Sequence, residues 1–400
     1  MEYLYYKFGN NNFELRKEFQ LQGGNIMNNN YPSIFKPFKL PSGIELKNRI
    51  LMAPMTTSAS TPHGDLTEEE LIYYARRAKG GIGAVITSCA HVELLGVGFE
   101  NSMGVESDAR IPSLTKLANT IKENGAKAIL QIFHAGRMTN STLLKGEKPV
   151  SASAIPSLRQ NAETPREMSN DEIETTIKVF GEATRRAIEA GFDGVEIHGA
   201  NTFLIQQFFS PHSNRRTDKW GGSVEKRMAF PLAVVESVKK AVKNHAKEPF
   251  IVGYRLSPEE REQPGITMDD TIKLVKVLAT KELDYIHASV GNFFGGSLRN
   301  SEDTVSRVQL IQETVGNEVP VMGVGALQTP EQVEKALSIT SLVSLGHALI
   351  MDPEWMEKTQ NSEEKTIFDA LYVSKKEELD IPEALWNKLV NTSGWFNIQD

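Results

Sequence analysis

The sequence predicts an α/β protein of the (β/α)8 barrel class, also called a TIM barrel, built as one domain. From Ile50 onward, eight short β-rich apolar segments alternate with amphipathic segments of helical period. Most of the apolar segments are continuous hydrophobic runs, as expected of parallel strands that are buried on both faces. Eight strand–helix pairs without a shift in composition match a barrel better than a doubly wound sheet.

The expected strands follow one another in regular order along the chain. They are Ile50–Met55, Ala84–Ala90, Ala128–His134, Gly194–Gly199, Phe250–Leu256, Tyr285–Gly291, Val319–Gly325 and Leu342–Gly346. In the first expected helix, Thr67 precedes Glu70 by three residues, which predicts a capping box. The longest connections follow the third and fourth strands, at roughly Ala135–Ser169 and Asn201–Gly222, and such long loops are usually functional.

The barrel is expected to span residues 31–356, between two terminal segments. Residues 1–30 end in a polar, Asn-rich stretch that predicts a disordered extension, with Met27 as the hypothetical true start. Residues 357–400 form a charged, helical tail that contains Trp386 and Trp395. This tail packs either on the barrel or on a partner subunit of a homo-oligomer, and the sequence leaves both open.

Composition narrows the function classes. The formal net charge of −7 argues against broad binding to nucleic acid or anionic membranes. The single cysteine, Cys89, excludes an intramolecular disulfide and any cysteine-built metal or iron–sulfur site. No apolar run reaches membrane-spanning length, and the N-terminus is a poor secretory signal. We therefore expect a cytoplasmic protein that acts on small molecules.

In a barrel enzyme the reactive groups lie at the carboxyl ends of the strands. In strand order, these ends supply Pro54, Met55 and Thr56, then Cys89, Gln131, His198 with Asn201, Arg255, Gly323 with Gly325, and Gly346 with His347. The glycine turns after the last two strands suggest a phosphate site, although glycine after a strand is also ordinary turn chemistry. No cluster has the spacing of metal ligands, so no metal site is predicted.

Three of these side chains allow both a functional and a structural interpretation. Arg255 lies inside an apolar strand and needs either an ion-pair partner or an anionic ligand. His198 and Asn201 could donate hydrogen bonds to one oxygen and stabilise developing negative charge on it. Alternatively, Asn201 caps the following helix and His198 packs in the barrel. A lyase or aldolase is disfavoured because no lysine suited to a Schiff base lies at a strand end.

Several segments together resemble the Old Yellow Enzyme family of flavoproteins, and within it the bacterial NADH-dependent flavin oxidoreductases, or ene-reductases. The matching segments are "NRILMAPMT", "QIFHAGR", "EIHGAN", "VGYRLS", "VPVMGVGALQTPEQ" and "SLGHALIMDPEW". They cover roughly residues 33–356 in the family's order. The resemblance implies a barrel that binds FMN and takes electrons from NADH or NADPH.

The same resemblance assigns a role to each strand-end residue. Pro54, Met55, Thr56 and Cys89 would border the flavin ring, and Gln131 would hold its pyrimidine edge. Arg255 would lie near flavin N1, while Gly323, Gly325, Gly346 and His347 would surround the phosphate. His198 and Asn201 would bind the carbonyl oxygen of an acceptor such as an α,β-unsaturated carbonyl, a quinone or a nitro compound.

Two residues depart from the family's pattern. Family members usually carry a proton-donating tyrosine two residues after the asparagine, where this chain has Phe203. His347 replaces an arginine that commonly helps to hold the phosphate, and histidine is mostly neutral at pH 7. The alternative to an ordinary ene-reductase is therefore a flavin-binding barrel with weak or altered turnover.

Overall fold

The computed structural model describes residues 21–22, 25–26 and 30–400 of the 400-residue chain. Most of the expected N-terminal extension, including the hypothetical start at Met27, lies outside the described residues. Within the extension, β1 (Leu21–Gln22) and β2 (Asn25–Ile26) pair antiparallel. Across the described part of the chain, no helix combines the length and the apolar composition that a membrane crossing requires.

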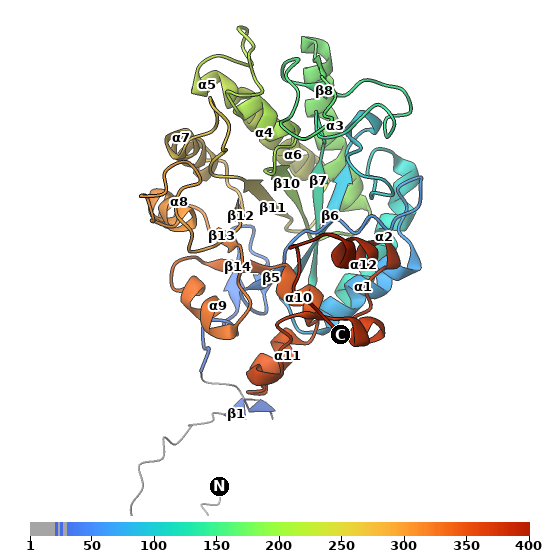
Figure 1. Cartoon of the computed structure of the whole chain (residues 1–400), viewed down its shortest axis with the longest axis vertical. Coiled ribbons are helices and arrows are strands. Elements are labelled where there is room, and N and C mark those ends of the chain that lie inside the picture. Colours follow the sequence, from blue (N-terminus) through green and yellow to red (C-terminus); the bar gives the residue numbers. More distant parts are fainter. Residues whose placement is uncertain (1–20, 23–24, 27–29) are drawn as a thin grey trace, which may run out of the picture.

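Eight parallel strands close into a barrel, which confirms the predicted fold class (Figure 1). They are β5 (Ile50–Met52), β6 (Ala84–His91), β7 (Lys127–Phe133), β10 (Gly194–Gly199), β11 (Ile251–Leu256), β12 (Tyr285–Ser289), β13 (Val321–Val324) and β14 (Leu342–Leu345). Each predicted apolar run supplies one strand, and nearly all strand residues are buried. Pairing of β14 with β5 completes the ring.

Helices surround the barrel, and side-chain caps fix where several of them begin. They are α1 (Glu68–Lys79), α2 (Ile111–Glu123), α3 (Asn170–Glu189), α6 (Ala229–His245), α7 (Met268–Ala279), α8 (Arg307–Val315), α9 (Pro330–Leu337) and α10 (His347–Met351). The predicted capping box at α1 is present, because the Thr67 hydroxyl accepts from the Glu70 N–H and the Glu70 carboxylate accepts from the Thr67 N–H. Such a box satisfies amide groups that the helix itself leaves without partners.

Apolar side chains fill the amino-terminal end of the barrel. A hairpin of β3 (Phe38–Lys39) and β4 (Glu45–Leu46) contributes Leu40 and Leu46 to a buried cluster with inward-facing strand residues. Gly253 in β11 lies opposite Tyr285 in β12, and the missing side chain makes room for the tyrosine ring. The polar side chains are therefore concentrated at the other end of the barrel, the carboxyl end of its strands.

The two long loops form one connected layer over that other end. The loop after β7 carries β8 (Val150–Ser151) and β9 (Arg166–Glu167), and the loop after β10 carries α4 (Leu204–Phe209), which precedes α5 (Val224–Arg227). The side chain of Gln207 in α4 joins the two loops. Its Oε1 accepts from the Arg137 N–H and the Ser151 hydroxyl, and its Nε2 donates to Ala135 O. The buried amide of Gln207 thus fixes both loops against the barrel.

The C-terminal tail packs against the barrel of its own chain, one of the two arrangements left open by the sequence. It contains α11 (Trp355–Gln360), β15 (Leu371–Tyr372), α12 (Glu383–Asn391) and β16 (Ile398–Gln399). Figure 1 shows α12 beside α1. Glu69 of α1 accepts from the Glu383 N–H at the start of α12. Trp386 and Leu389 of α12 join the main hydrophobic core.

We expect Gly253→Ala to lower the thermal unfolding midpoint, because the new Cβ would lie 2.2 Å from the buried Tyr285 ring. Overpacking of this kind costs about 1–3 kcal/mol. Gly291→Ala is the matched control, since nothing lies within 4 Å of a Cβ built there. Thermal denaturation followed by circular dichroism measures both, and equal midpoints for the two variants would contradict this account of the barrel interior.

Candidate active site at the carboxyl end of the barrel

All the predicted site residues lie around the carboxyl end of the barrel. Pro54, Met55 and Thr56 directly follow β5; Cys89 is in β6, Gln131 in β7, His198 in β10, Arg255 in β11 and Gly323 in β13; Asn201, Gly325, Gly346 and His347 come just after strands. The register sets His198 beside Arg255 and Cys89 beside Gln131. Residues from seven strands therefore meet in one ring, where barrel enzymes hold their active sites.

The turn after β10 is strained and firmly held. The β-branched Thr202 has a φ of 66°, a region that such residues rarely adopt, and Asn201 has a φ of 55°, which asparagine tolerates better. The Asn201 N–H donates to the Ser257 hydroxyl (2.9 Å), and Asn201 Oδ1 accepts from the Ser289 hydroxyl (3.0 Å). Phe203, rather than Asn201, occupies the N-cap position of α4, so the interpretation of Asn201 as a helix cap was wrong.

His198 is a buried, neutral hydrogen-bond donor. His198 lies at the carboxyl end of the barrel, called the mouth below, yet the residue is only 3% exposed. Nδ1 accepts from the Ala200 N–H (3.3 Å), which places the ring proton on Nε2. Burial lowers the pKa of His198 well below its usual value, and the positive charge of Arg255 adds to this effect. At pH 7 the ring is therefore uncharged, with Nε2–H available to a ligand.

Phe203 forms an apolar wall beside this imidazole. Its ring packs edge-on to His198 (centroids 4.9 Å apart) and to Phe133 (5.1 Å). Phe99, from the loop after β6, contacts Phe203 from another side at 6.1 Å. Phe203, where the resemblance implies a tyrosine, thus lies directly against His198, and its side chain has no transferable proton.

Arg255 is a buried cation without a direct counter-charge. Its residue is 7% exposed, its Nε has no hydrogen-bond partner, and it makes no ion pair with a carboxylate of the described chain. Burial lowers the pKa of Arg255, and the nearby Glu196 opposes that effect. Because an unpaired buried charge is costly, this geometry favours an anionic or electron-rich ligand over a structural ion pair.

A buried polar chain lies beside Arg255, and sequence reasoning missed it. Glu196 accepts from Gln131 Nε2 (2.7 Å) and contacts His287 Nδ1 (2.8 Å), while His287 Nε2 contacts the Ser344 hydroxyl (2.9 Å). Burial alone would raise the pKa of Glu196, but its contact with His287 and the charge of Arg255 lower it overall, while burial lowers the pKa of His287 itself. The available signal was a carboxylate and a histidine inside apolar strands, the same signal that identified Arg255.

The loop after β5 contacts the strands on both of its sides. Thr56 Oγ1 lies 3.8 Å from Cys89 Sγ in β6, and a Cβ added to Gly346 after β14 would lie 3.2 Å from Met55 Sδ. Burial raises the pKa of the Cys89 thiol to about 12, so it is an unreactive small side chain. Met55 and Thr56 are partly exposed and border the mouth.

The glycines after the last strands serve different purposes. Gly325 has φ of 132°, and a Cβ there would lie 2.6 Å from Val290 O, so only glycine suits this turn. Gly323 lies within β13, where a Cβ would overlap the Phe293 ring at 2.1 Å, a packing constraint. His347 is exposed, its ring lies 4.2 Å from that of Phe396, and desolvation lowers its pKa. His347 therefore brings no positive charge at pH 7.

The side chains at the mouth fit the FMN that the resemblance implies. Arg255 offers an unpartnered cation to the electron-rich pyrimidine edge of a flavin. The amide nitrogen of Gln131 is taken by Glu196, which leaves its carbonyl oxygen to accept from a ligand N–H. Gly346 has no side chain to obstruct a group that approaches beside Met55.

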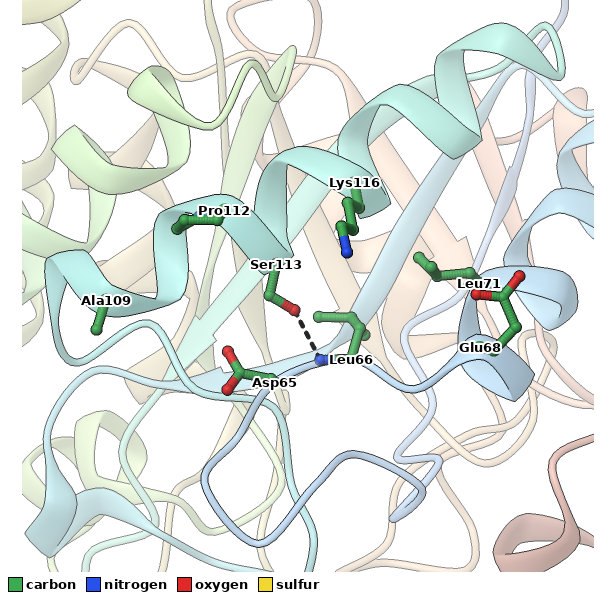
Figure 2. Close-up of a pocket in the computed structure, with 8 residues that line it drawn as sticks. All are labelled: Asp65, Leu66, Glu68, Leu71, Ala109, Pro112, Ser113 and Lys116. Carbon is green, nitrogen blue, oxygen red and sulfur yellow. Dashed lines mark hydrogen bonds between the residues drawn. The ribbon is translucent and has the colours of Figure 1, made fainter.

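Several hollows lie outside this ring, and two of them involve the loop after β5. One, of about 300 Å³, lies between α1 and α2 on the outside of the barrel, where the Leu66 N–H donates to the Ser113 hydroxyl (2.8 Å; Figure 2). The other, of about 580 Å³, is lined by Phe99 and by the loops after β5 and β6. None of the predicted site residues lines either hollow. Among the described residues, no group of three or more His, Cys, Asp or Glu side chains could hold a metal ion.

The sequence and structure both match known proteins. Residues 33–366 match the NADH:flavin oxidoreductase / NADH oxidase family. A probable NADH-dependent flavin oxidoreductase, YqiG of Bacillus subtilis, is 46% identical over 378 residues, which cover 94% of this chain and 100% of that protein. The NADH:acrylate oxidoreductase of Vibrio harveyi is 49% identical over 349 residues, but these cover 86% of this chain and only 34% of that protein.

Two solved structures support the same assignment. Morphinone reductase in complex with tetrahydroNAD superposes with a TM-score of 0.72 at 26% identity, over 83% of this chain and 91% of that one. An old yellow enzyme homologue from Zymomonas mobilis gives 0.72 at 26% identity, over 83% and 93%. The chain therefore belongs to the NADH:flavin oxidoreductase / NADH oxidase family, as an NAD(P)H-dependent, FMN-using barrel enzyme of the Old Yellow Enzyme type.

Proposed function

We propose that the protein passes electrons from NADH or NADPH to an electron-poor small molecule, such as an α,β-unsaturated carbonyl, a quinone or a nitro compound. FMN, when bound, supplies the hydride chemistry. The observation that carries the proposal is the neutral donor pair of His198 and Asn201 beside the unpaired cation of Arg255. The relative named for acrylate, an electron-poor alkene, supports this class of acceptor.

Residues at the ends of six strands would share in holding the cofactor. Arg255 would bind the N1 side of the pyrimidine edge and Gln131 would accept from it, as their unused atoms allow. Pro54, Met55, Thr56 and Cys89 would border the ring, and the backbone at Gly323, Gly325, Gly346 and His347 would surround the phosphate. The glycines let backbone N–H groups approach an anion closely.

His198 and Asn201 would act on the acceptor. His198 Nε2–H is neutral and fixed, and Asn201 Oδ1 is held by Ser289, so the asparagine NH2 group is left to donate. Two preorganised donors on one carbonyl oxygen polarise the double bond and stabilise the negative charge that develops on that oxygen during hydride addition. Their fixed positions mean that little reorganisation is needed during the reaction.

The source of the proton decides between an ordinary ene-reductase and a flavin-binding barrel with weak or altered turnover. Reduction of an enone needs a proton at the α-carbon, and Phe203 cannot supply it. The nearby hydroxyls of Ser257 and Ser289 are engaged with Asn201. Water would then supply the proton, so enones would turn over slowly while quinones, which do not need protonation at carbon, would be affected less. A flavin-binding barrel with weak or altered turnover is the second candidate, favoured by Phe203.

One experiment tests the proposal and separates its two forms. The FMN-loaded protein is reduced anaerobically with NADH or NADPH, and enones, acrylate, quinones and nitro compounds are then added while the flavin spectrum is followed. Bleaching by the nucleotide and recovery with at least one acceptor class are expected. A protein that gains no flavin spectrum with FMN would refute the proposal, and rapid cyclohexenone reduction would reject weak turnover. The net charge of −7 argues against nucleic-acid and anionic-membrane partners, and a cytoplasmic location is part of the proposal.

We expect Arg255→Ala to weaken FMN binding by roughly 10- to 100-fold, since a hydrogen bond to a charged group contributes about 1.5–3 kcal/mol. The apoprotein should lose no stability, because the change removes an unpaired buried charge. Fluorescence titration of apoprotein with FMN measures the first effect, and thermal denaturation the second. Arg255→Lys keeps the charge but not the planar guanidinium, so its FMN affinity should fall between those of wild type and Arg255→Ala. Unchanged FMN affinity in Arg255→Ala would contradict the assignment.

Phe203→Tyr should speed the oxidation of the reduced enzyme by an enone at least about tenfold, because a positioned general acid typically contributes 10²–10⁴-fold. Single-turnover stopped-flow absorbance gives this rate. The rate with a quinone should change less, and this acceptor serves as the internal control. An unchanged enone rate would show that proton delivery from this position does not limit the reaction.

The lowered pKa of His198 predicts a flat pH profile for the acceptor step. A depressed histidine pKa means that the ring is already neutral below the ordinary value of about 6.5, so Nε2–H donates equally between about pH 6.5 and 8. His198→Asn, which keeps a donor but cannot titrate, is the control and should give the same shape. A transition near the ordinary histidine pKa that is present in wild type and lost in His198→Asn would contradict this.

A further inference from the structure

The end of the C-terminal tail lies on one of the predicted phosphate-site residues. Phe396 stacks at 4.2 Å on the ring of His347, the first residue after Gly346, and Trp395 contacts the same imidazole edge-on at 6.2 Å. Trp395 nevertheless keeps 38% of its surface exposed. Two aromatic rings from residues 395–396 therefore flank the turn after β14, and one of them retains a free face.

The tail is held in this place from both sides. Strand β16 pairs in parallel with β15, and the Leu371 N–H donates to Asn397 O (2.8 Å) directly after the two aromatic residues. Earlier in the tail, Lys388 of α12 donates to the hydroxyl of Ser58, in the loop that begins with Pro54, Met55 and Thr56. The tail thus touches the loop after β5 and the loop after β14.

Those two loops are neighbours, because β14 pairs with β5 in the barrel and Met55 lies beside Gly346. Both are predicted to contact FMN, one along the ring and the other at the phosphate. A segment that touches both loops lies across the side of the site where they meet. The family match ends at residue 366, so this arrangement comes from residues beyond the matched region.

We propose that residues 388–397 complete the flavin site, with Trp395 and Phe396 as binding residues that hold His347 against the phosphate side and slow FMN release. This inference rests on the proposed cofactor site. His347 is neutral, so the backbone N–H groups of the glycine turns, rather than a cation, would hold the phosphate, and the tail would keep the turn after β14 in place around it. Docking of the tail and binding of FMN would then favour each other, because a ligand stabilises the state that binds it.

The first test uses the double variant Trp395→Ala/Phe396→Ala and a chain shortened after Asn391. Fluorescence titration of each apoprotein with FMN should show affinity lower by about tenfold or more. Val373→Ala is the control, because this tail side chain is 44% exposed and lies outside the β15–β16 pairing. Circular dichroism confirms that each variant is folded. Wild-type affinity in both tail variants would overturn the inference.

The second test needs no substitution. Limited proteolysis of the wild-type chain, with and without saturating FMN, should show slower cleavage between α12 and the C-terminus when FMN is bound. Equal cleavage rates would overturn the coupling. A wild-type chain that binds no FMN would overturn both the proposed function and this inference, whereas normal FMN binding that is independent of the tail would overturn the inference alone.

Discussion

The unpaired charge of Arg255 is the constraint on which the site depends. The guanidinium lies inside a closed barrel, on a strand that is otherwise apolar, and its Nε has no partner. The nearest acid, Glu196, is already engaged by Gln131 and His287. A cation in such a place costs free energy unless a bound ligand supplies the hydrogen bonds or the negative charge that it lacks. A protein that keeps this arrangement has a site prepared for an electron-rich group.

The buried positive charge also explains the state of the neighbouring groups. Burial, together with the charge of Arg255, keeps the His198 imidazole neutral. A neutral imidazole can donate a hydrogen bond to the ligand without adding a second positive charge to the site. Arg255 likewise helps to keep Glu196 ionised within the barrel. The polar chain from Gln131 to Ser344 fixes the side chains beneath the mouth, so that the groups above it are rigid before any ligand arrives.

The sequence predicted the barrel well, because continuous apolar runs and helix caps are local signals. It also predicted which side chains gather at the carboxyl end of the barrel, since the ends of parallel strands must meet at one face, while their roles in binding stay predictions. The Glu196–His287 contact escaped notice because it joins residues 91 positions apart, and each looked like a core residue in its own strand. The strained backbone at Thr202, which β-branched residues do not favour, is held by Gln207 from outside the turn, while Ser257 accepts from the Asn201 N–H beside it. The contact between Phe396 and His347 depends on how the whole tail folds back.

A crystal structure of the chain with FMN would show whether the flavin lies across Arg255 at the carboxyl end of the barrel. We expect the guanidinium to contact the pyrimidine edge of the ring, with Met55 and Thr56 beside it and His198 facing the space above. A structure in which Arg255 turns to form an ion pair with Glu196, and FMN binds elsewhere or not at all, would contradict this expectation.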